Sequence, residues 1–189
     1  MKEEFEMTLY FITGNAHKFS EFDEILSPQV KVYKLEAELD EIQSISPQEV
    51  IKHKLIEAMK YHTGEFLVED TSVLLEAFLW KLPGPLIKWF IKALGKKGIY
   101  EMVKKLGLFG AEAKVILGYS NGKEITFFEG TIKGKIVSPR GESSFDWDPI
   151  FLPEGQTKTF AEMSKQKKNS LSARGIAVRK FKEFYITKK

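Results

Sequence analysis

Two long strand-forming stretches separated by a tight turn constrain the fold of this chain more than any other feature. They run from residue 111 to 119 and from 124 to 137, and Ser120-Asn121-Gly122 lies between them. Asn-Gly is a strong hairpin signal, because both residues accept the left-handed backbone of a two-residue turn. The two stretches are therefore predicted to pair in an antiparallel manner.

Other strands alternate with helices, which favours parallel pairing elsewhere in the same sheet. The apolar run Leu9-Tyr10-Phe11-Ile12 stops at Thr13-Gly14-Asn15, and Asn15 suits the N-cap of a helix that carries Phe19, Phe22 and Leu26 at helical spacing. Residues 30–35 and 65–68 are the next predicted strands. The fold class expected is α/β, with a mixed parallel and antiparallel sheet.

Further helices follow from caps and apolar spacing. Ser46-Pro47-Gln48-Glu49 is a capping box that opens a helix ending near Gly64. Two short helices are predicted over 86–94 and 99–106, and the first is expected to bury the stripe Leu86, Trp89, Phe90, Ala93 and Leu94. A C-terminal helix is expected to leave a basic face in solvent, formed by Arg179, Lys180 and Lys182.

Composition excludes several kinds of site. The 189 residues contain no cysteine, so there is no disulfide or thiolate site, and the three histidines lack the spacing of a zinc site. The 29 basic and 26 acidic residues leave a net charge of only +3, which does not by itself argue for nucleic acid. No apolar run approaches the ~18 residues of a membrane span, and the acidic N-terminus lacks a signal peptide. A cytoplasmic protein of one domain, residues 1–189, is expected.

The segment from residue 144 to 174 resembles a binding site for a nucleobase. Phe145 and Trp147 alternate with Asp146 and Asp148, and two cations follow, Lys168 and Arg174. A base is held by stacking on its face and by hydrogen bonds to its edge. The alternative is a proline-rich turn whose aromatic side chains only fill a core.

Two earlier segments are candidates for binding phosphate and a further ligand. The turn at Gly14 and Asn15, with Lys18 in the first turn of the helix, places backbone N–H groups and a cation where an anion could bind. Glu69 and Asp70 follow the strand 65–68, at the sheet edge where α/β proteins bind ligands. Alternation allows only one of them to face a given ligand directly, and a helix cap at Asp70 or Thr71 is the structural alternative.

The order of short motifs resembles the inosine triphosphate pyrophosphatase family from Leu9 to Tyr185. Single motifs are common, but this many in one order are specific. They are Thr13-Gly14-Asn15-Ala16-His17-Lys18, Val68-Glu69-Asp70-Thr71, Pro83-Gly84-Pro85, Ser138-Pro139-Arg140-Gly141, Phe145-Asp146-Trp147-Asp148-Pro149, Thr159-Phe160-Ala161-Glu162-Met163 and Lys168-Asn169. The resemblance implies an elongated α/β fold with two lobes around a central cleft, and a homodimer.

The resemblance also implies an activity: Mg²⁺-dependent hydrolysis of inosine, deoxyinosine or xanthosine triphosphate to the monophosphate and pyrophosphate, which cleanses the nucleotide pool. Glu41 and Asp70 would hold Mg²⁺, and Asp70 would also orient or deprotonate the attacking water, with Glu69 as the less favoured candidate. The remaining candidates would bind the substrate: Thr13, Gly14, Asn15, Ala16, His17, Lys18, Thr71, Lys88, Phe145, Asp146, Trp147, Asp148, Lys168 and Arg174. Among these, Phe145 and Trp147 would sandwich the purine and Arg174 would donate to its six-position oxo group.

Three departures from the family pattern leave specificity open. Ala173 stands where the family has histidine, Asp146 where it has glycine, and His53, between Lys52 and Lys54, where it has lysine. The alternatives are a nucleotide-binding sensor without turnover, a relative acting on modified pyrimidine triphosphates, and an RNA-binding module that uses Phe145, Trp147 and the basic C-terminal helix. Residues 1–7 are expected to be a disordered extension, with Met1 or Met7 as the start.

Overall fold

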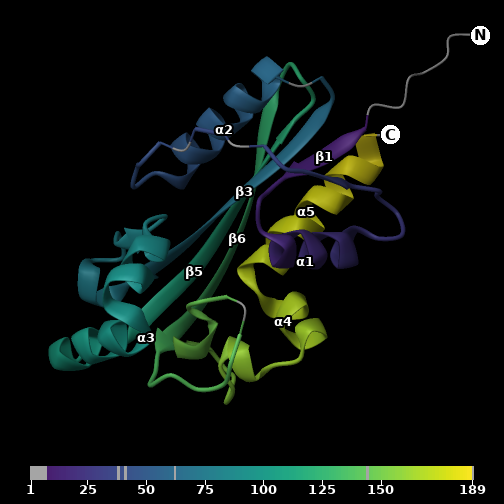
Figure 1. Ribbon diagram of the computed structural model, residues 1–189. Coiled ribbons are helices and arrows are strands. Elements are labelled where there is room, and N and C mark those ends of the chain that lie inside the picture. Colours follow the sequence, from purple (N-terminus) through teal and green to yellow (C-terminus); the bar gives the residue numbers. More distant parts are fainter. Residues whose placement is uncertain (1–7, 38, 41, 62, 144, 189) are drawn as a thin grey trace, which may run out of the picture.

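The computed structural model describes residues 8–37, 39–40, 42–61, 63–143 and 145–188. The expectation for residues 1–7 lies outside this part of the chain. A seven-stranded sheet runs through the described part in the order β2-β1-β3-β5-β6-β7, and β4 pairs with β3 (Figure 1). The strands are β1 (Leu9–Ile12), β2 (Tyr33–Leu35), β3 (Glu65–Leu75), β4 (Pro83–Gly84), β5 (Gly110–Ser120), β6 (Ile125–Ile136) and β7 (Phe151–Pro153).

Five α-helices flank the sheet in the described part, together with three short 3₁₀ turns. The helices are α1 (Ala16–Leu26), α2 (Pro47–Tyr61), α3 (Ile87–Leu106), α4 (Lys165–Leu171) and α5 (Ala173–Lys188), and the 3₁₀ turns are Glu76–Phe78, Asp148–Ile150 and Phe160–Glu162. In Figure 1, α1 and α5 lie together on one side of the long strands, and α2 lies on the other.

The predicted mixed sheet and its hairpin are confirmed. β5 and β6 pair antiparallel from Gly110↔Lys135 to Ser120↔Ile125, with the Asn121-Gly122 turn at the far end. β1 pairs parallel with both β2 and β3, while β3 pairs antiparallel with β5. The parallel strands come from the two strand–helix units at the start of the chain, as their alternation predicts.

Two strand boundaries differ from the prediction. β3 continues to Leu75, seven residues beyond the predicted end at Val68, and it pairs with β5 along this length. β2 is shorter than expected, because Val30 and Val32 are buried in the core without joining the ladder. The structural alternative, a helix cap at Asp70 or Thr71, is therefore excluded, since both residues lie within a strand.

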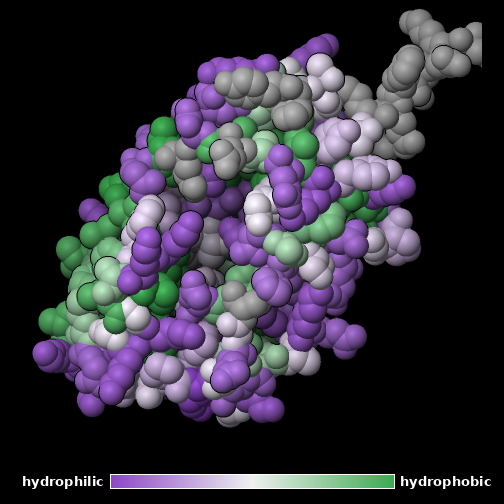
Figure 2. Space-filling view, viewed as in Figure 1, coloured by the Kyte–Doolittle hydropathy of each residue, from purple (hydrophilic) through white to green (hydrophobic). Residues whose placement is uncertain are grey.

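The predicted orientation of the helix after Pro85 is also wrong. α3 consists of two helical segments separated by a kink at the non-helical Gly95 (φ 67°), which confirms the two helices predicted on either side of this residue. It buries Ile87, whereas Trp89 and Leu94 are 49% and 44% exposed. Figure 2 shows apolar side chains gathered on the edge of the molecule where Figure 1 places α3.

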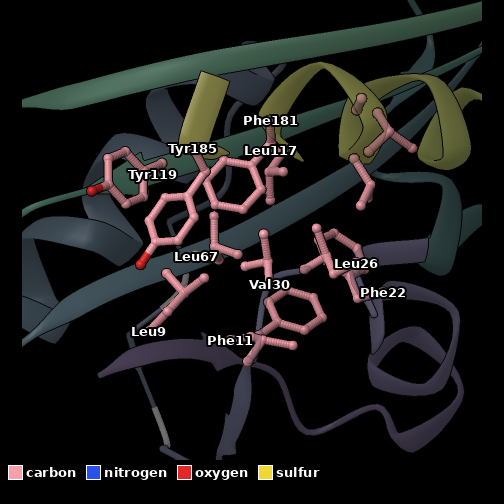
Figure 3. Close-up of a cluster of buried hydrophobic side chains, with 14 of the residues drawn as sticks. Leu9, Phe11, Phe22, Leu26, Val30, Leu67, Leu117, Tyr119, Phe181 and Tyr185 are labelled. Atoms are coloured by element: carbon pink, nitrogen blue, oxygen red, sulfur yellow. The ribbon is translucent and has the colours of Figure 1, made fainter. Parts of the chain in front are cut away.

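The largest core lies between the sheet and the helix pair α1 and α5 (Figure 3). Phe11 of β1 stacks on Phe22 of α1 with 4.1 Å between the ring centroids, and Tyr119 and Phe181 pack next to them at 5.5 Å from each other. Full burial of each such side chain stabilises the fold by roughly 1.5–3 kcal/mol. This core fixes α1 and α5 against the sheet and so places both helix N-termini.

The sequence suggested that the basic face of α5 lies in solvent, but Arg179 and Lys182 on this face form hydrogen bonds within the protein. Lys182 Nζ donates to the carbonyl of Ile25 at the end of α1 (2.7 Å), and Arg179 donates to the carbonyls of Asn169 and Ser170 at the end of α4 (2.9 Å each). These cations satisfy carbonyl groups that a helix C-terminus leaves without partners. They tie α1 and α4 to α5.

Within the described residues, no helix has the length and apolar character needed to cross a lipid bilayer.

The contact between α2 and the sheet depends on Gly118 of β5. A Cβ atom at this position would lie 2.3 Å from Ile51 Cγ2 and 2.9 Å from Leu55 Cδ1. We expect Gly118→Ala to lower the free energy of unfolding by about 1–3 kcal/mol, because overpacking forces the helix away from the strand. Urea denaturation measures this change.

Gly14→Ala is the matched control, because a Cβ atom there meets no atom within 4 Å. We expect its effect to stay within about 0.5 kcal/mol. Equal stabilities of the two variants would contradict the close helix–sheet contact.

Candidate functional site

The site is built around a gap in strand pairing along one edge of β3. The ladder between β1 and β3 is recorded as far as Phe11↔Leu67, and the ladder between β4 and β3 begins at Val73↔Gly84. Between these points β5 pairs with β3 on one side, and no ladder between described residues covers the other side. Polar side chains at residues 69–72 can therefore remain in the middle of a long strand, rather than at its end as the sequence suggested.

Alternation along β3 sends its two acids to opposite faces of the sheet, as predicted. Glu69 points to the face covered by α5, where it meets Arg174. Asp70 lies in a small pocket on the other face with Val50 of α2. The two acids thus take part in different groups of side chains.

Arg174, in the first turn of α5, is held by two buried carboxylates. Its Nε donates to Glu69 Oε2 (2.8 Å) and its Nη2 to Glu69 Oε1 (3.0 Å), while Nη1 donates to Glu21 of α1. Thr71 Oγ1 accepts a further bond from Nη2 at 3.3 Å, and Lys18 Nζ reaches Glu69 Oε1 at 2.7 Å. The bidentate geometry fixes the plane of the guanidinium.

A second cation, Lys168 of α4, continues this network of charges. Its Nζ lies 2.7 Å from Asp148 Oδ2 and 3.3 Å from Glu21 Oε1. Ser143 Oγ donates to the same Asp148 oxygen at 2.7 Å. Asp148 Oδ1, by contrast, is buried and has no hydrogen-bond partner among the described residues.

Burial and charge shift the pKa values of these groups in different directions. Burial alone would raise the pKa of Glu69, but the charges and hydrogen bonds of Arg174 and Lys18 outweigh it and hold the pKa well below its usual value. Burial raises the pKa of Asp148, and Lys168 offsets this only in part. Glu69 is therefore a fixed anion and a poor general base for a water molecule.

Phe145 lies in contact with both cations. Lys168 Nζ is 3.9 Å and Arg174 Cζ 4.8 Å from its ring centroid, and the ring of His17 approaches it at 6.3 Å in an edge-on orientation. Phe145 lines two neighbouring pockets, one of about 300 Å³ with His17 and one of about 20 Å³ with Arg174. An aromatic face, two cations and an acceptor without a partner thus converge on one place.

Trp147 has a partly structural role. Its ring packs edge-on against Phe151 (5.5 Å) and Phe160 (5.9 Å), which agrees with the alternative that this aromatic fills a core. It also lines the small pocket with Phe145 and Ala173. A purine held between Phe145 and Trp147 stays a prediction.

The predicted phosphate loop, residues 13–18, joins β1 to α1. Asn15 caps the helix as predicted, because its Oδ1 accepts from the backbone N–H of His17 (3.0 Å) and of Lys18 (3.1 Å). Thr13 Oγ1 accepts from Asn15 N at 3.1 Å, Gly14 has open space around it, and Ala16 is exposed. Asn15 itself uses two of the N–H groups expected to face an anion, so Lys18 and the open backbone at Gly14 are what the loop offers to phosphate.

Asp70, a predicted metal ligand, lies in a small pocket on the face of the sheet opposite Arg174. It is 8% exposed and lines a pocket of about 60 Å³ with Ser44, Gln43 and Lys88. One carboxylate with neighbouring hydroxyl and amide oxygens suits Mg²⁺, which keeps several waters and binds phosphate oxygens. Glu41, the second predicted ligand, lies outside the described residues, and the described residues alone contain no group of three acids or histidines for a metal.

Sequence reasoning missed Glu21, which joins Arg174 to Lys168 and is only 4% exposed. Its spacing of three from Lys18 places both on one helix face, which was the available signal. Of the remaining candidates, Asp146 is exposed, and His53 Nδ1 lies 3.0 Å from the carbonyl oxygen of Asp40. Ala173 is buried in the wall of the small pocket.

Comparison with known proteins identifies the family to which this chain belongs. The model of the Ham1 family matches residues 9–184. The inosine triphosphate pyrophosphatase of Schizosaccharomyces pombe is 38% identical over 96% of this chain and 97% of its own, and that of Podospora anserina is 44% identical over 93% and 92%. The solved structure of the Staphylococcus aureus Ham1 protein has a TM-score of 0.78 and 25% identity, and covers 96% of this chain and 100% of its own. The resemblance inferred from the motifs is confirmed: the chain belongs to the Ham1 family.

Proposed function

We propose that this protein hydrolyses non-standard purine nucleoside triphosphates, such as those of inosine, deoxyinosine and xanthosine, to the monophosphate and pyrophosphate. The observation that carries the proposal is the Asp148 carboxylate. Its Oδ2 is bound by Lys168 and Ser143, whereas its buried Oδ1 has no partner among the described residues. A buried acceptor without a donor is costly, so a ligand that brings a donor stabilises it.

The polarity of the pocket fits the edge of an oxo purine. Arg174 and Lys168 supply donors for a carbonyl at the six position, and Asp148 supplies an acceptor for the neighbouring N–H. Adenine presents an amino donor and a ring acceptor at these positions, the reverse arrangement. A site with this polarity rejects adenine by leaving buried groups unpaired.

The phosphate end of the substrate is assigned to the other polar residues of the cleft. Residues 13–18, with Lys18 as the cation, bind the triphosphate, and Thr71 and Lys88 are further contacts. Lys88 and Asp70 line one pocket, which supports a phosphate group there. Phe145, Trp147 and Asp146 remain assigned to the base, Asp146 from an exposed position.

Mg²⁺ is the proposed cofactor, held by Asp70 and Glu41. When bound, it supplies charge that offsets the negative charge of the phosphate oxygens during transfer. Asp70 orients the attacking water, because Glu69 is already occupied by Arg174 and Lys18. The leaving group is pyrophosphate, and Lys88 stabilises its charge.

We propose that the protein binds neither nucleic acid nor a membrane. Two cations of α5 that an RNA-binding surface would use, Arg179 and Lys182, donate to backbone carbonyls of neighbouring helices. The cytoplasmic location expected from the sequence stays a prediction, as do the single domain and its two lobes.

Pyrophosphate release in the presence of Mg²⁺ tests the reaction and the base together. We expect inosine and xanthosine triphosphates to be hydrolysed with a kcat/KM at least about tenfold above that of adenosine triphosphate, the cost of one mismatched hydrogen bond. The panel includes guanosine, uridine and cytidine triphosphates in ribo and deoxy forms. Binding without release from any of them would favour a nucleotide sensor instead.

Asp70→Asn tests the assigned role of this carboxylate. The amide keeps the shape of the side chain but loses its charge and its basicity, so we expect kcat to fall by at least about a hundredfold. Asp23→Asn, at an exposed position on α1, is the matched control and should retain activity. Wild-type turnover in Asp70→Asn, with a normal melting temperature, would remove Asp70 from this role.

A homodimer is the proposed assembly, and exposed apolar side chains support it. They are Leu79 (79% exposed) and Trp80 (47%), which follow the 3₁₀ turn Glu76–Phe78, and Leu106 (54%) and Leu108 (40%), at the end of α3 and just after it. Leu79 and Trp80 also hold the left-handed conformation at φ 57°, which costs roughly 1–2 kcal/mol for each residue that is not glycine. A strained turn that exposes apolar side chains is typical of an interaction surface.

Light scattering after size exclusion measures this assembly. We expect twice the 21.7 kDa mass of one chain for the wild type and the mass of one chain for Trp80→Ser. Phe127→Ser is the matched control, because Phe127 is similarly exposed but lies near the opposite end of β6. A dimer that survives Trp80→Ser would place the interface elsewhere.

A further inference from the structure

Glu69 connects the two halves of the proposed site. Its carboxylate, with the side chain 1% exposed, binds Lys18 from the phosphate loop at 2.7 Å and Arg174 from α5 at 2.8 Å and 3.0 Å. One oxygen, Oε1, is shared, because it accepts from Lys18 Nζ and from Arg174 Nη2. A single buried anion therefore holds the cation proposed for phosphate, Lys18, and one of the two proposed for the base, Arg174.

The two cations depend on Glu69 to different degrees. Arg174 has a second carboxylate, Glu21, and a hydroxyl, Thr71, among its partners. Among the described residues, Lys18 forms its ion pair with Glu69, and 24% of the lysine side chain is exposed. Lys18 can thus reach an incoming phosphate, but it must then leave or share the buried carboxylate.

We infer that Glu69 is a positioning residue that sets the balance between phosphate affinity and base selectivity. Its carboxylate holds the guanidinium of Arg174 in the orientation that binds the base, and its ion pair with Lys18 competes with binding of Lys18 to the triphosphate. Every nucleoside triphosphate carries the same phosphates, so weaker phosphate binding lowers the affinity for all of them equally, and only a nucleotide with well-matched base contacts then still binds tightly. This inference rests on the proposed function, which assigns Lys18 to phosphate and Arg174 to the base.

The inference predicts opposite changes when the charge of Glu69 is removed. In Glu69→Gln, Lys18 loses its buried counter-ion and becomes available to phosphate, so the phosphate end should bind more tightly. Arg174 keeps Glu21 and Thr71 but loses its bidentate partner, so the base should bind less tightly. A purely structural role would weaken both ends together.

Binding of two partial ligands separates these effects in the full-length chain. Titration calorimetry with inorganic tripolyphosphate at one fixed Mg²⁺ concentration reports the phosphate end, and fluorescence titration with inosine reports the base end. For Glu69→Gln we expect the Kd of tripolyphosphate to fall by about threefold or more and that of inosine to rise by about tenfold, as for one charge-assisted hydrogen bond.

Glu21→Gln is the matched control, because Glu21 contacts Arg174 and Lys168 but has no recorded bond to Lys18. We expect Glu21→Gln to raise the Kd of inosine and to leave the Kd of tripolyphosphate within about twofold of the wild-type value. If Glu69→Gln does not fold, Glu69→Asp replaces it, since a shorter carboxylate cannot reach both cations. We expect this variant also to bind tripolyphosphate more tightly and inosine less tightly.

Unchanged or weaker tripolyphosphate binding in the Glu69 variant would overturn the inference. This outcome is distinct from failure of the proposed function. Absence of hydrolysis by the wild type would reject the function, while the two binding titrations would still decide whether Glu69 opposes phosphate and supports the base.

Discussion

The functional half of this fold depends on an interruption in strand pairing. β3 is held along one side by β5, but on its other side the ladder with β1 is recorded only to Leu67 and that with β4 starts at Val73. Polar side chains on both faces of β3 lie at this gap, Glu69 on the face covered by α5 and Asp70 on the opposite face. A single ligand that contacts both faces must pass along this unpaired edge of the strand.

The charges around this opening are not explained by stability. Glu21, Glu69, Asp148, Lys168 and Arg174 are all at least nine-tenths buried. Buried ion pairs often contribute no more than apolar side chains of the same size, because desolvation offsets their attraction. Their value here is orientation: acids on α1, on β3 and after the loop at residue 145 fix two cations against one aromatic ring.

Sequence patterns predicted the type of fold and the motifs of the site, because turns, caps and hairpins are local. The hairpin at Asn121-Gly122 and the cap at Asn15 are examples. The sequence patterns failed where contacts between residues distant in the chain determine the structure. The polar pair Glu69-Asp70 looked like the end of a strand, since only the pairing with β5 carries the strand past it. Glu21 looked like part of a solvated helix face, because the arginine that buries it lies 153 residues away.

The large sequence separation between Arg174 and its acids affects the order in which the protein folds. Arg174 meets Glu69 across 105 residues of chain and Glu21 across 153, so its contacts are among the most non-local in the fold. Contacts of this kind carry a large loop-closure entropy and form late, and a chain that leaves the ribosome from its N-terminus makes the two acids long before their arginine. The sheet can thus assemble around a pocket that has no binding capacity, and nucleotide recognition begins only when the last helix docks.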